Sequence, residues 1–141
     1  MIVHPAVIVH GVADVRAALA PGLPVTLLSA PGAAMFAGCL WWREMVALAR
    51  VGYQHTPALD ILDCADASGL AIGALRSGVG RLVLWSDAPG WGAVAAIAKG
   101  RGGFVLSQAP AALDLAQRNA LRHLDAWLRD RGRGPVTAPL L

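Results

Sequence analysis

The side chains best suited to bind a ligand stand in four short turns of similar composition. Each turn follows an apolar run and combines a polar residue, an alanine, a proline or serine, and a glycine or alanine. The turns are SAPG (29–32), DASG (66–69), DAPG (87–90) and QAPA (108–111). Small residues at the start of a helix let a phosphate approach the unpaired backbone N–H groups there. The turns therefore predict a site for a small anionic or phosphorylated ligand.

The first turn has the most favourable composition for such a ligand. Its small residues, Gly32 and Ala33, follow Ser29 and leave room for a phosphate near the backbone. It lacks the lysine of a P-loop and the glycine spacing of a dinucleotide-binding fingerprint. The ligand-binding candidates from all four turns are Ser29, Gly32, Ala33, Asp66, Asp87 and Gln108.

Helix capping explains the same residues without a ligand. A Ser or Asp at the N-cap accepts a hydrogen bond from one of the unpaired N–H groups of the first helical turn. Aspartate also suits the positive end of the helix dipole. On this interpretation Ser29, Asp66 and Asp87 cap the helices that follow them, and Ala33 is small because its helix packs close to a sheet.

Cys64 and His10 are the candidates for covalent or acid–base chemistry. Cys64 stands between Asp63 and Asp66, and nearby carboxylates raise the pKa of a thiol, so a buried and unreactive cysteine is the stronger prediction. Cys39 is likewise expected in the core.

His10 ends the first apolar run and has two candidate roles, a hydrogen bond to its own loop or a contact with the ligand. An enzyme that uses Cys64, His10 or an aspartate is the alternative to a binding protein.

No metal site or cofactor follows from the remaining residues. The four histidines are scattered, and no pair has the i, i+4 spacing that places two ligands on one helix face. The chain has two cysteines and no C-x-x-C motif. The sequence therefore predicts no metal and identifies no cofactor.

Apolar runs alternate with helical patterns along most of the chain. The predicted strands are residues 6–10, 25–29, 59–65, 81–85 and 103–107. The predicted helices are residues 12–20, 32–53, 69–78, 90–100 and 112–132. The central runs are apolar on both faces, which is typical of parallel strands covered on both sides. We therefore expect an α/β fold, a single three-layer domain over residues 1–134 with about five mostly parallel strands and helices on both faces, and a loose tail at residues 135–141.

This alternation is similar to the broad class of Rossmann-like or flavodoxin-like open sheets. Strand orders 3-2-1-4-5 and 2-1-3-4-5 both fit it. In either order the first strand lies beside the point where the strand order reverses, and ligands bind there at the carboxyl edge. His10 and the four turns are therefore expected along one edge of the sheet, although the fold class does not fix the function.

The composition is apolar for a domain of this kind. Hydrophobic residues make up 56% and charged residues 15% of the chain, so we expect some apolar surface to be buried between subunits. Phe36, Trp41 and Trp42 lie in a helical pattern that is apolar on more than one side, and they are the predicted interface of a homo-oligomer. The alternative is that these aromatic residues line a ligand cleft. A homo-oligomeric structural or interaction module is thus the third functional class.

Membrane insertion and nucleic-acid binding are not expected. No stretch reaches the roughly 18 consecutive apolar residues of a spanning helix, and no Lys or Arg precedes the apolar part of the N-terminus. Two cysteines without an export signal favour the cytoplasm and free thiols. The net charge is +3, but the basic residues of the last helix alternate with aspartates, which is typical of a solvated face rather than of a nucleic-acid surface.

Overall fold

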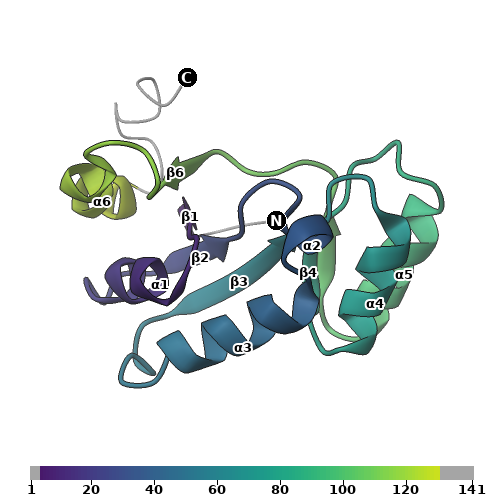
Figure 1. Cartoon of the computed structure of the whole chain (residues 1–141), viewed down its shortest axis with the longest axis horizontal. Helices are drawn as coiled ribbons and strands as arrows, with labels where there is room; N and C mark the ends of the chain where they lie inside the picture. Colours follow the sequence, from purple (N-terminus) through teal and green to yellow (C-terminus); the bar gives the residue numbers. More distant parts are fainter. Residues whose placement is uncertain (1–3, 131–141) are drawn as a thin grey trace. The chain divides into compact units, whose positions relative to one another are not determined.

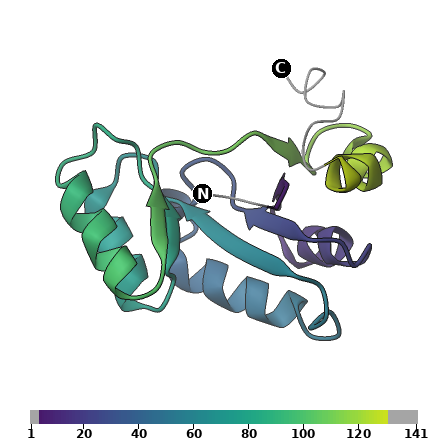
Figure 2. The same cartoon turned by 180° about the vertical axis from the view of Figure 1, so that it is seen from behind.

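Six strands form a parallel sheet in the order β5-β4-β3-β2-β1-β6 in the computed structural model, which describes residues 4–130. Helices follow most of the strands (Figure 1, and Figure 2 from behind). The elements are β1 (Ala6–Ile8), α1 (Val12–Leu19), β2 (Val25–Leu28), α2 (Ala33–Phe36), α3 (Cys39–Ala49), β3 (Ala58–Asp63), α4 (Ser68–Arg76), β4 (Arg81–Val83), α5 (Trp91–Gly100), β5 (Phe104–Leu106), β6 (Ala112–Asp114) and α6 (Ala120–Arg129). The predicted α/β class is confirmed, with six strands rather than five.

The strand order differs from both predicted orders. Strands β1 to β5 neighbour one another in the order of the sequence, and β6 then pairs with the other side of β1. Both orders that fitted the sequence are therefore wrong. They place β3 or β4 on the second side of β1, whereas the structure places β6 there. The reversal lies between β1 and β6, which pair in parallel with Val7 opposite Leu113.

The chain divides into two compact units. Unit 1 comprises Met1–Leu28, Met45–Asp60 and Pro110–Leu141, and unit 2 comprises Ser29–Glu44 and Ile61–Ala109. The single domain over residues 1–134 stays a prediction, and the predicted tail at 135–141 lies outside the described residues. None of the helices within residues 4–130 has the length and apolar content needed to cross a membrane.

In unit 1, β1 pairs with β2 on one side and with β6 on the other. Val7 is fully buried at the centre of these three strands, as are Leu27 of β2 and Leu113 of β6. Helix α6 buries Trp127 completely, and its indole Nε1 donates a hydrogen bond of 2.8 Å to the Ala6 carbonyl oxygen. Burial of these side chains, worth about 1.5–3 kcal/mol for each large apolar residue, holds the last helix against the first strand.

The last helix is shorter than the sequence predicts. Residues 112–114 form β6 instead of a helical turn, and α6 begins at Ala120 after Asn119, whose φ is +64°. The prediction was wrong because Leu113 fits the helical spacing of the later apolar residues, while in the structure it is a buried strand residue. The helix ends at Arg129, and the glycines predicted to end it lie outside the described residues.

The long helix predicted for residues 32–53 is interrupted. It forms two helices, α2 and α3, with Gly38 between them at a φ of +88°. This left-handed conformation has no steric cost for glycine and ends the helix. In the rest of unit 2, the end of β3 pairs with β4 and β4 with β5, and α4 packs against α5.

Among the described glycines, Gly103 has the least space for a side chain. A Cβ added there would overlap the carbonyl oxygen of Gly80, which lies in the turn before β4. The Gly103→Ala variant is expected to lose about 1–3 kcal/mol of unfolding free energy, because the two strand ends must move apart. Urea denaturation followed by circular dichroism measures this loss.

Gly100→Ala is the matched control, because a Cβ at the end of α5 meets nothing within 4 Å. It should be neutral or stabilising by up to about 1 kcal/mol. Equal urea midpoints for the two variants would contradict the close approach of Gly80 and Gly103.

Candidate functional site

Two polar residues stand where the strand order reverses. His10 follows the carboxyl end of β1, and Asp114 is the last residue of β6. Both strands belong to unit 1 and pair in parallel, with Ile8 opposite Asp114. In open parallel sheets, ligands bind outside the carboxyl ends of the strands at such a reversal. The fold thus brings together two residues that are 104 positions apart in the sequence.

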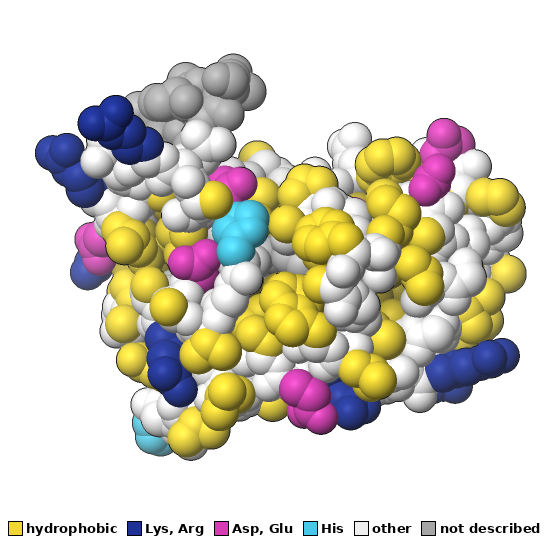
Figure 3. All heavy atoms as spheres, in the orientation of Figure 1, with side chains coloured by type: hydrophobic (Ala, Val, Ile, Leu, Met, Phe, Trp, Pro, Cys, Tyr) yellow, Lys and Arg dark blue, Asp and Glu magenta, His cyan; other side chains and the backbone are white. Residues whose placement is uncertain are grey.

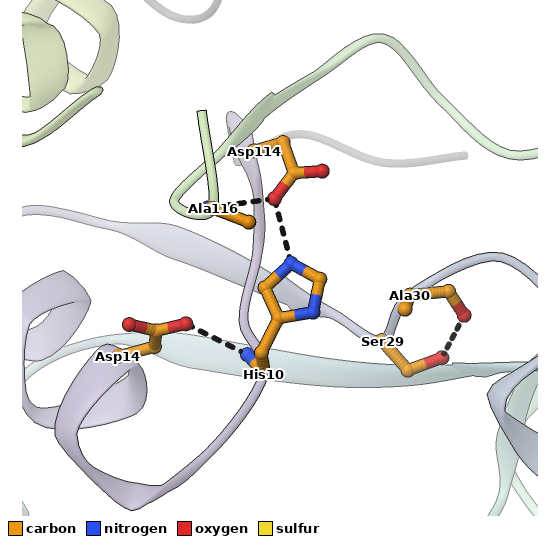
Figure 4. Close-up of polar contacts among 6 residues, drawn as sticks. All are labelled: His10, Asp14, Ser29, Ala30, Asp114 and Ala116. Atoms are coloured by element: carbon orange, nitrogen blue, oxygen red, sulfur yellow. Dashed lines mark hydrogen bonds and ion pairs between the residues drawn. The ribbon is translucent and has the colours of Figure 1, made fainter. Parts of the chain in front are cut away.

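The imidazole of His10 is held by hydrogen bonds at its ring and at its backbone (Figure 4). Its Nε2 lies 2.6 Å from Oδ1 of Asp114, and the same oxygen accepts a hydrogen bond of 2.9 Å from the backbone N–H of Ala116. The backbone N–H of His10 donates to Oδ2 of Asp14, in the first turn of α1, at 2.9 Å. The side chains of His10 and Asp114 are 36% and 25% exposed, so the pair is anchored and still reached by solvent.

The contact with Asp114 determines what the ring can do. An ionised carboxylate only accepts hydrogen bonds, so Nε2 carries a proton and its N–H donates a hydrogen bond to Asp114. The other ring nitrogen, Nδ1, makes no hydrogen bond within the part of the chain that the structure describes. In a neutral imidazole Nδ1 accepts a hydrogen bond or a proton, and in a protonated one it donates. Asp114 thus fixes the orientation of the ring and leaves Nδ1 as its second polar atom.

The charges around the ring are mainly negative. The carboxylates of Asp14 and Asp114 both contact His10, one at the backbone and one at the ring. Asp14 also occupies the first turn of α1, where a bound anion would otherwise meet the helix dipole. Two carboxylates therefore lie within hydrogen-bond distance of His10.

The turn that begins at Ser29 is closed by its own hydrogen bonds. The Ser29 hydroxyl accepts a hydrogen bond of 2.9 Å from the Asp63 N–H and donates one of 3.1 Å to the Ala30 carbonyl. Ala33 is 1% exposed, and its N–H donates to the same carbonyl. The residues predicted to admit a phosphate here are thus buried, and this geometry adds no support for a ligand at Gly32 and Ala33.

The predicted helix caps are wrong. The N-cap residues of α2, α4 and α5 are Gly32, Ala67 and Gly90, and none of them caps through a side chain. Gly32 and Gly90 adopt φ values of +69° and +70°, which moves the helix start past Ser29 and Asp87. Asp66 immediately precedes the N-cap of α4, and its carbonyl accepts a hydrogen bond from the Ser68 N–H.

The structure distributes the remaining candidates over the two units. His10 lies in unit 1, whereas the candidates Ser29, Gly32, Ala33, Cys64, Asp66, Asp87 and Gln108 lie in unit 2. Asp66, Asp87 and Gln108 are exposed and follow the neighbouring strands β3, β4 and β5. Their use as one ligand site with His10 stays a prediction.

The predicted interface residues have three different surroundings. Phe36 is 71% exposed on α2, and Trp41 lines a cavity in unit 2. Trp42 is fully buried inside the protomer, and its indole Nε1 has no hydrogen-bond partner among residues 4–130. Of these three residues, Phe36 and Trp41 are therefore the ones with accessible aromatic surface.

Asp114 is the site residue that sequence reasoning missed. It was assigned to a helix because the apolar residues around it fit helical spacing. The available signal was its place directly after the three apolar residues 111–113, because a short apolar run also fits a strand. Among residues 4–130, no group of three His, Cys, Asp or Glu side chains is arranged to hold a metal ion.

The two cysteines differ in exposure. Cys64 is fully buried, and burial together with the nearby Asp63 carboxylate raises the pKa of its thiol to about 12. Cys39, expected in the core, is only partly buried. The prediction of an unreactive Cys64 therefore has a physical basis in the structure, since only the thiolate is nucleophilic.

Alkylation by iodoacetamide tests this difference. In a Cys39→Ser variant at pH 9, folded Cys64 should react several hundredfold more slowly than in urea, because a thiol with a pKa of about 12 is only about 0.1% ionised at that pH. Because its pKa is higher in the folded state, the protonated Cys64 thiol contributes to the stability of the folded state below the unfolded pKa of about 8.5. This stability is lost as the pH rises towards the folded pKa of about 12. Equal rates in buffer and in urea would show that Cys64 is an accessible thiolate.

Comparisons of the chain with protein-family models, with curated proteins and with solved structures gave no match. The function must therefore be inferred from the geometry of this chain.

Proposed function

We propose that the protein binds a small polar ligand at the carboxyl ends of β1 and β6, where His10 contacts the ligand and Asp114 orients His10. The observation that carries this proposal is the 2.6 Å contact between His10 Nε2 and Asp114 Oδ1 at the reversal of the strand order. Ligands of open parallel sheets bind at such a reversal of strand order. The polar side chains of His10 and Asp114 can form directional hydrogen bonds there.

The hydrogen-bond pattern supports a role beyond stabilising the loop. A loop contact alone would be satisfied by the backbone bond from His10 to Asp14. The ring makes a second bond, and Asp114 is itself fixed by the Ala116 N–H. Such a chain of bonds reduces the rotational freedom of the ring, so less entropy is lost when a ligand binds to Nδ1.

A neutral or cationic ligand with hydroxyl or amine donors fits the site best. The neutral ring accepts a hydrogen bond at Nδ1, and the two carboxylates disfavour a phosphate dianion. The anionic ligand expected from the sequence remains a prediction for the turns of unit 2, where Asp66, Asp87 and Gln108 are exposed.

Acid–base catalysis at the same residues is the second candidate function. A carboxylate that fixes the tautomer of a histidine is the arrangement by which the other ring nitrogen acts as a general base. Here Nδ1 would remove a proton from a ligand hydroxyl, and Asp114 would stabilise the imidazolium that forms. Turnover of the bound ligand separates this function from binding alone.

Ligand screening tests the proposal directly. Polyols, sugars, amines and sugar phosphates are added to the protein, and binding is measured by thermal shift and by ¹H–¹⁵N NMR. A ligand at 100 times its Kd adds about 2.7 kcal/mol of stability. The His10→Ala variant should bind a neutral hit about twofold to tenfold more weakly, because a hydrogen bond between neutral groups contributes about 0.5–1.5 kcal/mol.

His123→Ala is the control for His10→Ala, because His123 is an exposed histidine on α6. It should bind the hit as the unchanged protein does. A hit that binds His10→Ala with full affinity, or hits that are sugar phosphates alone, would contradict the proposed site.

Asp114→Asn tests the orienting role without a ligand. Long-range ¹H–¹⁵N spectra at pH 9 report which nitrogen of a neutral imidazole carries the proton. The unchanged protein should show the Nε2–H form of His10, and the variant should show a mixture, because an amide both donates and accepts. A dominant Nδ1–H form in the unchanged protein would overturn the assigned geometry.

A further inference from the structure

Unit 2 contains a cavity of about 430 Å³ between the end of α2, the start of α3 and one face of α4. Its large walls are Leu40, Trp41 and Leu70, and the lining residues with polar side-chain atoms are Cys39, Trp41 and Ser77. The volume is within the range of about 300–1,000 Å³ that is typical of small-molecule sites. The mostly apolar lining suits a hydrocarbon group.

Two glycines account for the open space. Gly38 separates α2 from α3, so the chain turns there instead of continuing one helix across the cavity. Gly73 lies within α4, and a Cβ added to it would meet nothing within 4 Å. Glycine inside a helix costs about 1 kcal/mol relative to alanine. Gly73 thus makes α4 less stable than an alanine would, and a side chain at this position would occupy the cavity.

Apolar side chains also surround the cavity on the surface. Leu40 and Leu70 line it and are 55% and 45% exposed, and Met35 and Phe36 lie beside it on α2 at 54% and 71%. Hydrophobic side chains reach the surface over this part of the molecule (Figure 3). At roughly 200 Å² for each large side chain, the four expose on the order of 450 Å². A stable dimer buries about 800 Å² on each subunit, so the patch is small for a second copy of the chain.

The Ser77 end of the cavity is basic. Arg43 Nη1 donates a hydrogen bond of 2.8 Å to the Ser77 carbonyl, and Arg101 Nη1 donates one of 2.9 Å to a carbonyl in the last turn of α4. Arg43 also forms an ion pair of 3.3 Å with Glu44. Because Arg43 contacts a residue that lines the cavity, its guanidinium favours an anionic group of a ligand at this end.

We infer that this cavity binds a small apolar carboxylic acid, with its hydrocarbon part against Trp41, Leu40 and Leu70 and its carboxylate at the Ser77 end near Arg43. The inference does not depend on the site at His10, which lies in the other unit. It assigns to Trp41 the role of a cavity wall.

Calorimetric titration with linear carboxylates from butanoate to decanoate, below their micellar concentrations, tests this inference. Binding should be saturable with one site, and the affinity should rise about fourfold for each added methylene group until the cavity is full. Octan-1-ol should bind about threefold to fivefold more weakly than octanoate, because an exposed ion pair contributes up to about 1 kcal/mol.

Three variants separate the parts of the inference. Gly73→Leu places a side chain in the cavity and should weaken octanoate binding at least tenfold, with Gly73→Ala intermediate if the larger variant does not fold. Gly92→Leu is the matched control, because Gly92 is a glycine of α5 with nothing within 4 Å of an added Cβ and lies outside the cavity lining. Arg43→Met should lower the affinity for octanoate to that of octan-1-ol and leave the alcohol unaffected.

Several results would overturn the inference. The cavity is not a ligand site if decanoate shows no saturable binding at 1 mM, or if folded Gly73→Leu or Gly73→Ala binds as tightly as the unchanged protein. The ligand is not an acid if octan-1-ol binds as tightly as octanoate. His10→Ala should bind octanoate normally, so a failure of this inference is distinguishable from a failure of the site at His10.

Discussion

The pairing of β6 with β1 determines what unit 1 can do. Its register places Ile8 opposite Asp114, so the carboxylate lies next to the segment that leads to His10. The hydrogen bond from Trp127 to the Ala6 carbonyl attaches α6 to the same strand. Without this pairing, His10 would have only its backbone contact with Asp14, and its ring would have no fixed orientation. The pairing of two short strands is thus the condition for the contact between His10 and Asp114 at their ends.

Local sequence patterns predicted the fold class and the first five strands, but not the partner of His10. Runs such as residues 25–28 are apolar on both faces, and this property is visible in a single segment. The position of His10 at a strand end follows from the same pattern. Asp114 could not be found in this way, because β6 has three residues and Leu113 also fits a helical stripe. Strand pairing depends on contacts between distant segments, which a local pattern does not record.

Glycine is the second reason why details differed from prediction. Gly32 and Gly90 take left-handed conformations at the helix starts, so the polar residues before them do not cap. Gly38 ends α2 within a continuous apolar pattern, and the cavity of unit 2 lies at this break. The sequence shows where glycines stand, but their φ values depend on packing around them. The composition of the turns therefore indicated that a left-handed backbone conformation was possible there, but not which residue would adopt it.

The late position of β6 in the chain also has a kinetic consequence. During synthesis residues 112–114 emerge after β1 to β5 have been made. Closing a loop of this length has an entropic cost, and contacts between distant residues slow folding. Until β6 arrives, one edge of β1 has unpaired N–H and C=O groups, which are a template for strands of other molecules. Pairing with β6 therefore protects this edge of β1 from contacts with other molecules.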